Sequence, residues 1–174
     1  MVDILHQAVV MDHASIAQRM LQARKHVGMS QAQVAHAIMS SQTAIGLRER
    51  GEYLPKLDTL GHYAQRLNIS PVWLICGVGD IADHYEIGQQ AEPDPTHYSR
   101  IVSVNTPDVA KRVSFARDHA GISQRQLAEE LGLHRNSVMG WEIQRCMPTP
   151  DKFPAIAWAL NCNALWLATG VSVP

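Results

Sequence analysis

The chain repeats its own sequence, and this repeat limits the folds that it can adopt. With a shift of 93 residues, IAQRMLQARKHVGMSQAQVAHAI at 16–38 aligns without a gap with VAKRVSFARDHAGISQRQLAEEL at 109–131. The register holds to the far end of each repeat, where LNISPVWLICG at 67–77 faces LNCNALWLATG at 160–170. A gapless match over about sixty residues indicates a duplicated domain, because unrelated segments do not keep one register for so long.

Each repeat has the pattern of five short helices, which predicts an all-α fold. Thr106 and Pro107 suit the N-cap and the first helical position of the first helix in the second repeat. Ser30 and Ser123 suit the N-caps of the second helices, and a glycine two residues earlier closes each first helix. In chain order the helices are expected at 14–27, from Ser30, from about Ser41, at 57–67 and around Trp73, and then at 107–120, from Ser123, from about His134, at 151–160 and around Trp166.

Charge and composition divide the chain into two domains and a connection. Hydrophobic residues make up 46% of the 174 residues, which is enough for a packed core. Residues 1–80 and 105–174 each carry seven basic and six acidic side chains, whereas 81–104 carries one basic and four acidic side chains and contains proline. We therefore expect a first domain at 1–80, a polar linker at 81–104 and a second domain at 105–174. Since the net charge is only −1, any surface for nucleic acid must be local.

Several other classes of protein are disfavoured by the sequence. Cys76, Cys146 and Cys162 form no close pair, so we expect free thiols in a reducing compartment rather than disulfides. The nine histidines show no zinc-ligand spacing backed by cysteine pairs, and we expect no metal or other cofactor. No stretch has the pattern of a signal peptide or of a membrane span, so a cytoplasmic protein is expected. The sequence also shows no phosphate-binding glycine loop, nucleophile elbow or convincing carboxylate pair, so we do not expect an enzyme.

Residues in the second and third helices resemble those of a DNA-binding family. Gln31 opens the second helix, Ala35 follows four positions later, and a turn leads to a polar third helix that contains the β-branched Ile45. The equivalent residues of the second repeat are Gln124, Ala128 and Val138. This pattern resembles the lambda-repressor-like, XRE-type helix-turn-helix family, over both repeats and most of the chain. The resemblance implies two tandem five-helix domains that bind an operator in double-stranded DNA.

The N-terminal end of each third helix is expected to read bases in the major groove. A short polar helix that is held rigidly against its neighbour fits this groove, where side chains distinguish donor and acceptor patterns. Glutamine and asparagine suit adenine, arginine suits guanine, and methyl groups suit thymine. Without the resemblance, the same side chains would be interpreted as a solvated helix face. The residues expected to contact bases are Gln42, Thr43, Gly46, Leu47, Arg135, Asn136 and Met139.

Other polar residues suit contacts to the DNA backbone, which orient a protein without specifying sequence. Gln31 and Gln124 begin a helix, where free N–H groups and the helix dipole favour a phosphate, although capping alone would also explain them. Each of the other candidates, taken alone, is more often a solvated charge. The residues expected to contact phosphates are Gln31, Ser41, Arg50, Lys56, Gln124, Arg125 and Arg145.

A structural role is expected for two pairs of charged residues and two tryptophans. The pairs have the same spacing of 25 residues in both repeats, and in the family such a pair joins the first helix to the end of the third. They are Arg24 with Glu49 and Arg117 with Glu142. Trp73 and Trp166 are expected in the core, with a dimer contact through the fifth helix as the alternative.

The first repeat departs from the family pattern at the turn between its second and third helices. Where the second repeat has the turn glycine Gly132, the first has Met39. The apolar supports Leu133 and Trp141 are likewise replaced by Ser40 and Arg48. A left-handed turn costs a non-glycine residue about 1 kcal/mol. The first repeat therefore either bends differently or carries this strain.

The sequence leaves two functions open. In the first, the chain is a sequence-specific repressor from a phage, prophage or mobile element, and its repeats bind half-sites about 34 Å apart. Because the sequence ends at ATGVSVP after the second repeat, we expect no self-cleaving domain of the kind found in many lambda-type repressors, and an antirepressor protein as the trigger for release. A homodimer or higher oligomer is expected. In the second, one repeat, more readily the first, is a dimerisation or partner-binding module for an antirepressor or toxin, and only the other reads DNA.

Overall fold

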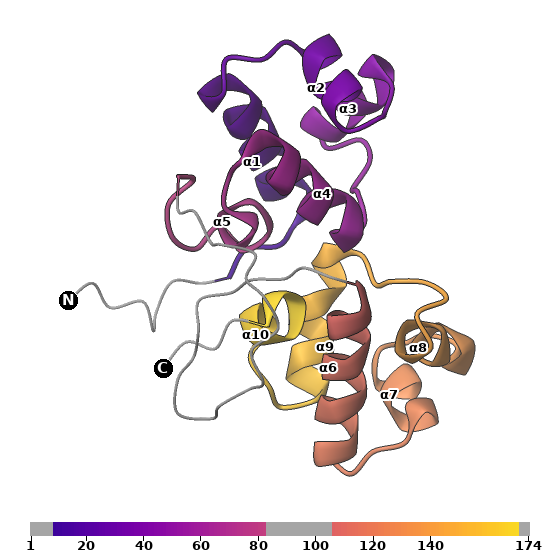
Figure 1. The fold of residues 1–174 in the computed structure, drawn as a ribbon. Helices are drawn as coiled ribbons and strands as arrows, with labels where there is room; N and C mark the ends of the chain where they lie inside the picture. Colours follow the sequence, from indigo (N-terminus) through magenta and orange to yellow (C-terminus); the bar gives the residue numbers. More distant parts are fainter. Residues whose placement is uncertain (1–8, 83–105, 171–174) are drawn as a thin grey trace, which may run out of the picture.

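A computed structural model describes residues 9–82 and 106–170 of the chain. Within these two ranges the chain forms ten α-helices and no strand (Figure 1). The expected all-α fold with two five-helix repeats is confirmed. Most of the expected linker at 81–104 lies outside the described residues. At its start, Ile81 packs against the core, and its carbonyl accepts a hydrogen bond from the Ser70 N–H at 3.0 Å.

The two repeats contain the same helices in the same order. The first repeat contains α1 (His13–His26), α2 (Gln31–Ala37), α3 (Gln42–Glu49), α4 (Leu57–Leu67) and α5 (Pro71–Cys76). The second repeat contains α6 (Thr106–His119), α7 (Gln124–Glu130), α8 (Arg135–Glu142), α9 (Phe153–Ala159) and α10 (Ala164–Thr169). A 3₁₀ turn at Pro150–Lys152 precedes α9, since Pro154 has no N–H to donate to an α-helical turn there. None of the described helices has the length and apolar character needed to cross a membrane.

Serine side chains start the second helix of each repeat, as expected. Ser30 Oγ accepts a hydrogen bond from the Gln33 N–H at 3.2 Å, while Gln33 Oε1 accepts one from the Ser30 N–H at 2.7 Å. Ser123 and Gln126 make the same two bonds at 3.2 and 2.8 Å. Each capping box satisfies N–H groups that the first turn of a helix leaves unpaired. The start of α2 and α7 is therefore determined by residues within four positions of each other.

The turn between the second and third helices has the same shape in both repeats, although only one of them has a glycine there. Met39 has a φ of 52° and Gly132 has a φ of 63°, so both are left-handed. In each repeat the N–H of the next residue donates to the carbonyl of the small helix residue, Ala35 or Ala128, at 2.8 Å. The first repeat therefore keeps the turn and carries the strain of a side chain at positive φ. The alternative of a different bend is wrong.

Replacing Met39 with glycine is expected to raise the free energy of unfolding by up to about 1 kcal/mol, because glycine adopts a positive φ without a Cβ clash. Met39 is exposed, so no core contact is lost. The matched change, Gly132→Ala, is expected to lower the free energy of unfolding by about 1 kcal/mol. A Cβ at Gly132 meets no atom within 4 Å, so this change reports backbone strain alone. Urea denaturation measures both, and two changes of the same sign would contradict the prediction.

Each repeat packs its helices around an apolar core. In the first repeat Ile16 and Met20 of α1 are fully buried, together with Tyr63 of α4. The Tyr63 hydroxyl donates a hydrogen bond to the Met20 carbonyl at 3.0 Å. Burial raises the pKa of the Tyr63 phenol, which keeps it in the neutral form that donates. Trp73 and Trp166, which were expected in the core, are partly buried at its edge.

The fifth helices of the two repeats contact each other. In Figure 1, α5 and α10 lie on the facing sides of the two repeats, and α3 and α8 both lie toward the right of the view. Both fifth helices are rich in buried apolar side chains, which include Leu74 and Ile75 in α5 and Leu165 and Leu167 in α10. Equivalent elements of the two repeats thus contact each other.

Candidate nucleic-acid interface

The third helix of the first repeat presents its polar N-terminal end to solvent. Ser41 is the N-cap of α3, and its Oγ accepts a hydrogen bond from the Ala44 N–H at 3.1 Å. Gln42 and Thr43 follow in the first turn and are exposed. Ile45 is fully buried, which fixes the face of α3 that packs inward. Gln42 and Thr43 are therefore accessible to a groove.

The third helix of the second repeat, α8, has the same arrangement with different side chains. His134 is its N-cap, and the His134 Nδ1 accepts a hydrogen bond from the Asn136 N–H at 3.2 Å. Arg135 and Asn136 are exposed, and Val138 is fully buried. The two exposed residues therefore occupy the positions on α8 that Gln42 and Thr43 occupy on α3.

The other residues expected to contact bases are less accessible. Gly46 is buried, and a Cβ at this position would lie 3.1 Å from Nη1 of Arg50. A base edge can approach Gly46 only if the Arg50 side chain moves away. Leu47 and Met139 are partly buried. The first turn of each helix is thus the most accessible part of the candidate surface.

The same set of hydrogen bonds holds the third helix in both repeats. Arg24 on α1 donates to both carboxylate oxygens of Glu49 at the end of α3, at 2.6 and 3.1 Å. Gln31 Nε2 at the start of α2 donates to the same carboxylate at 2.9 Å. The second repeat has the same bonds at 2.6, 3.1 and 2.8 Å, made by Arg117, Gln124 and Glu142. This Arg–Glu–Gln network joins three helices and so fixes the angle of the third helix against the second.

Charge compensation in this network depends on the arginine. The Glu49 and Glu142 side chains are only 5% and 8% exposed. The hydrogen bonds that Arg24 and Arg117 donate to these carboxylates raise the pKa of each arginine above its usual value. A carboxylate buried to this degree costs several kcal/mol without its counter-charge. Each network is therefore sensitive to the loss of one partner.

Comparison with protein-family models gives one match in each repeat. A helix-turn-helix model matches residues 20–74, and a model of a helix-turn-helix domain matches residues 110–173. The protein belongs to the lambda-repressor-like helix-turn-helix family. It carries two tandem copies of the domain, so it is a DNA-binding regulator of transcription. No match was found among curated proteins or among solved structures.

Most of the residues expected to contact phosphates are exposed on the helix-turn-helix domains. Gln31 and Gln124 are partly buried, because each donates one amide hydrogen to the Arg–Glu–Gln network. The exposed ones are Ser41, Arg50, Lys56, Arg125 and Arg145. Arg50 pairs with Glu52, and Arg125 pairs with Glu129 at 3.0 Å. Because such exposed ion pairs are weak, a phosphate can replace the carboxylate partner.

The sequence reasoning missed two arginines that hold the fifth helices. Arg19 is 9% exposed and donates to the carbonyls of Leu74 and Ile75, at 2.8 and 2.9 Å, at the end of α5. Arg112 of the second helix-turn-helix domain donates to two equivalent carbonyls of α10 at 3.0 and 3.1 Å. A Cβ at Gly77 would lie 3.0 Å from the Arg19 guanidinium, so glycine allows this close approach. The two arginines align with each other in the repeat, and this alignment was a sequence signal for a shared role. Their acceptors could not be predicted, because they lie more than fifty residues further along the chain.

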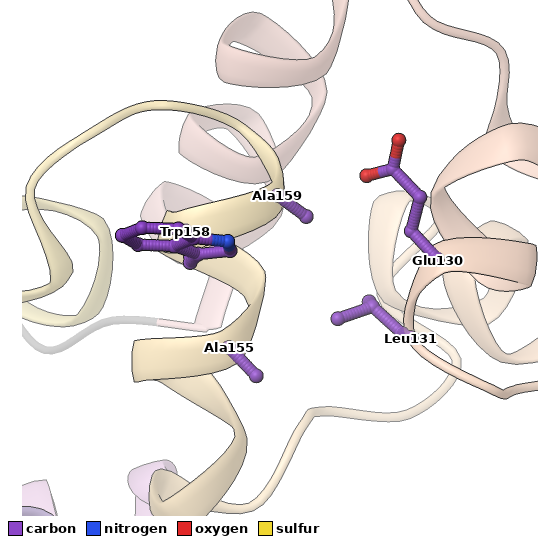
Figure 2. Close-up of a pocket in the computed structure, with 5 residues that line it drawn as sticks. All are labelled: Glu130, Leu131, Ala155, Trp158 and Ala159. Carbon is purple, nitrogen blue, oxygen red and sulfur yellow. The ribbon is translucent and has the colours of Figure 1, made fainter.

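A groove lies between α7 and α9 of the second helix-turn-helix domain. It has a volume of about 560 Å³, and Figure 2 shows Ala155 and Ala159 facing Leu131 and Glu130 across it. Trp158 lines its edge and is 87% exposed. The first domain has the polar residues His62, Gln65 and Arg66 in place of the three α9 residues. Trp158 and the two alanines are therefore a feature of the second domain rather than of the shared fold.

Proposed function

We propose that the chain is a repressor, of the kind that phages, prophages and mobile elements encode, and that both helix-turn-helix domains bind its operator. One observation carries the proposal: α3 and α8 each present an exposed polar first turn and are each held by the same Arg–Glu–Gln network. A reading helix enters the major groove with its N-terminal residues toward the bases. Repression, rather than activation, is supported by the resemblance to lambda-type repressors.

Base contacts are assigned to the first turns of α3 and α8. Gln42 suits adenine, and Thr43 offers a methyl group to thymine. Arg135 suits guanine, and Asn136 suits adenine. Apolar contacts one turn later are assigned to Leu47 and Met139. The four exposed polar residues therefore account for most of the sequence preference that we expect.

Phosphate contacts are assigned to the flanks of the reading helices. Gln31 and Gln124 lie at the N-termini of α2 and α7, where the helix dipole favours an anion. Exposed side chains near both helices complete the set, namely Ser41, Arg50, Lys56, Arg125 and Arg145. Because the net charge of the chain is −1, bulk attraction to DNA is weak. Specific binding then depends on these positioned contacts.

The contact between α5 and α10 supports joint binding by the two domains. Half-sites for such domains lie about 34 Å apart, which is one turn of the duplex. Once one domain is bound, the other is presented to its own half-site at a high effective concentration. A single chain then occupies both half-sites, which a protein with one such domain does only as a dimer.

Selection of bound fragments from random duplexes tests the proposal. We expect a motif in two parts whose centres are separated by about 10 base pairs. When this motif overlaps a promoter in a reporter strain, expression of the chain is expected to lower the reporter signal. A selection that enriches no motif would refute DNA reading, and a rise in the reporter signal would refute repression.

A second candidate function, association with a protein, is favoured by the groove beside Trp158. Tryptophan is among the residues most enriched at the energetic centres of interfaces, and this one is 87% exposed. Glu130 lines the groove, and the exposed Lys152 lies one turn before Ala155, so one surface carries both signs of charge. Such a surface is complementary to a second copy of itself. It lies on the second domain, whereas the sequence favoured the first as the partner-binding module.

Replacing Trp158 with serine is expected to weaken self-association of the chain about 30-fold, because truncating a central interface residue costs about 2 kcal/mol. Sedimentation velocity over a range of protein concentrations measures the change. The control is Phe115→Ser, since Phe115 is also exposed but lies on α6 beside Trp166. If the wild type stays monomeric, or if both variants associate as the wild type does, the groove is not a self-association surface.

A further inference from the structure

The contact between α5 and α10 joins the two domains through equivalent helices. When the same surface of two similar units meets itself, the units are related by an approximate two-fold axis. In Figure 1, α3 and α8 lie on the same side of this contact. An operator bound by a two-fold protein mirrors that symmetry in its base sequence. This contact between equivalent helices therefore favours half-sites in inverted orientation.

The scaffold that holds the reading helices is duplicated, but the side chains that read are not. The hydrogen bonds of the two Arg–Glu–Gln networks have the same lengths to within 0.1 Å, and the turns before α3 and α8 have the same left-handed shape. At equivalent positions, however, Gln42 of α3 is replaced by Arg135 of α8, and Thr43 by Asn136. All four are exposed. The two domains therefore dock in the same way and read different bases.

These four side chains have different hydrogen-bonding chemistry. The Gln42 amide has a donor and an acceptor, which match N7 and the amino group of adenine, and Thr43 adds a methyl group for thymine. The Arg135 guanidinium has donors only, which match the two acceptors of guanine. Opposite adenine, Arg135 would bring a donor against the amino group. A half-site that suits α3 is therefore a poor site for α8.

We propose that the operator of this chain consists of two unlike half-sites in inverted orientation. The half-site read by α3 is rich in A·T pairs, and the half-site read by α8 contains a guanine followed by an adenine contact. One chain then binds each operator in a single direction, whereas a homodimer with identical reading helices has no preferred direction. This inference rests on the proposed binding of the operator by both domains.

Three duplexes test the inference with the full chain. The first is the operator selected from random DNA, and the other two are palindromes built from each of its half-sites. The wild type is expected to bind the selected operator at least about tenfold more tightly than either palindrome, because one mismatched base pair costs on the order of tenfold in affinity. Titration at concentrations well above the Kd is expected to saturate at one chain per operator.

A variant with the same two base-reading residues in both domains makes the test more specific. These two residues, Gln42 and Thr43 in α3 or Arg135 and Asn136 in α8, are called the reading pair. Gln42→Arg with Thr43→Asn gives α3 the side chains of α8, and it is expected to make the palindrome of α8 half-sites the tightest ligand by about tenfold. The reverse exchange, Arg135→Gln with Asn136→Thr, is the matched control and is expected to favour the other palindrome. Since all four residues are exposed, the thermal unfolding of both variants is expected to match that of the wild type.

The outcomes separate this inference from the proposed function. A selected motif that is palindromic, equal affinity of the wild type for the three duplexes, or two chains on each operator would overturn the inference and leave DNA reading intact. Variants that keep the preference of the wild type would overturn the assignment of the reading pair. A selection that enriches no motif would overturn the inference and the proposed function together.

Discussion

Replacing Arg135 and Asn136 together with alanine is expected to lower the affinity of the chain for its selected operator about 30-fold or more. Each contact between such a side chain and a base contributes about 1–3 kcal/mol of discrimination, so the loss of two exceeds about 2 kcal/mol. Both residues are exposed in the first turn of α8, so the free energy of unfolding is expected to stay unchanged. Fluorescence anisotropy with a labelled operator measures the affinity, at one fixed salt concentration because DNA binding depends steeply on salt.

The matched change in the first domain is Gln42→Ala with Thr43→Ala. We expect it to lower the affinity for the operator about tenfold or more, while binding of both variants to an unrelated duplex serves as the control. If only the change in α8 abolishes specific binding, the first domain does not read DNA. The function in which one domain is a dimerisation or partner-binding module would then replace the two-domain repressor.

Replacing Arg24 with methionine is expected to lower the free energy of unfolding by about 3 kcal/mol. The change removes the positive charge beside the Glu49 carboxylate. The Glu49 side chain is 5% exposed and keeps only the Gln31 Nε2 donor of the Arg–Glu–Gln network. Methionine retains much of the apolar stem, so the loss reports charge rather than packing. For a domain of this size a loss of about 3 kcal/mol lowers the Tm by more than about 10 °C. Thermal unfolding followed by circular dichroism measures it.

A double variant, Arg24→Met with Glu49→Met, is the control for this prediction. Removing both charges is expected to restore most of the stability, because the cost lies in the uncompensated carboxylate rather than in the absence of the pair. Arg117→Met in the second domain is expected to have an effect of similar size, since the bonds there have the same lengths. If the single and double variants unfold at the same temperature, the pair contributes through packing and not through charge.

Much of the fold could be predicted because the repeat presents each local pattern twice. The capping serines Ser30 and Ser123, and the turn glycine Gly132, act on groups within a few positions of themselves. The turn at Met39 could not be predicted, since the sequence shows the cost of a left-handed methionine but not the tertiary contacts that outweigh it. The buried Ile38 and Ile45 on either side of the turn supply such contacts.

The candidate site could be predicted in part. The positions of Gln42 and Thr43 follow from helical periodicity, because Ile45 has to face the core. The surroundings of Gly46 do not follow from periodicity, since its burial depends on where the long side chain of Arg50 lies. Whether these residues contact bases stays a prediction for the binding experiments.

Local features of this protein follow from its sequence alone: the order of the helices, their caps and the chemistry at the ends of α3 and α8. These features depend on residues within one or two helical turns of each other. Three others needed the folded chain, namely the hydrogen bonds of Arg19 to the end of α5, the contact of α5 with α10, and the exposure of Trp158. Each depends on which distant segments become neighbours, because a side chain is buried or bonded only by what packs against it.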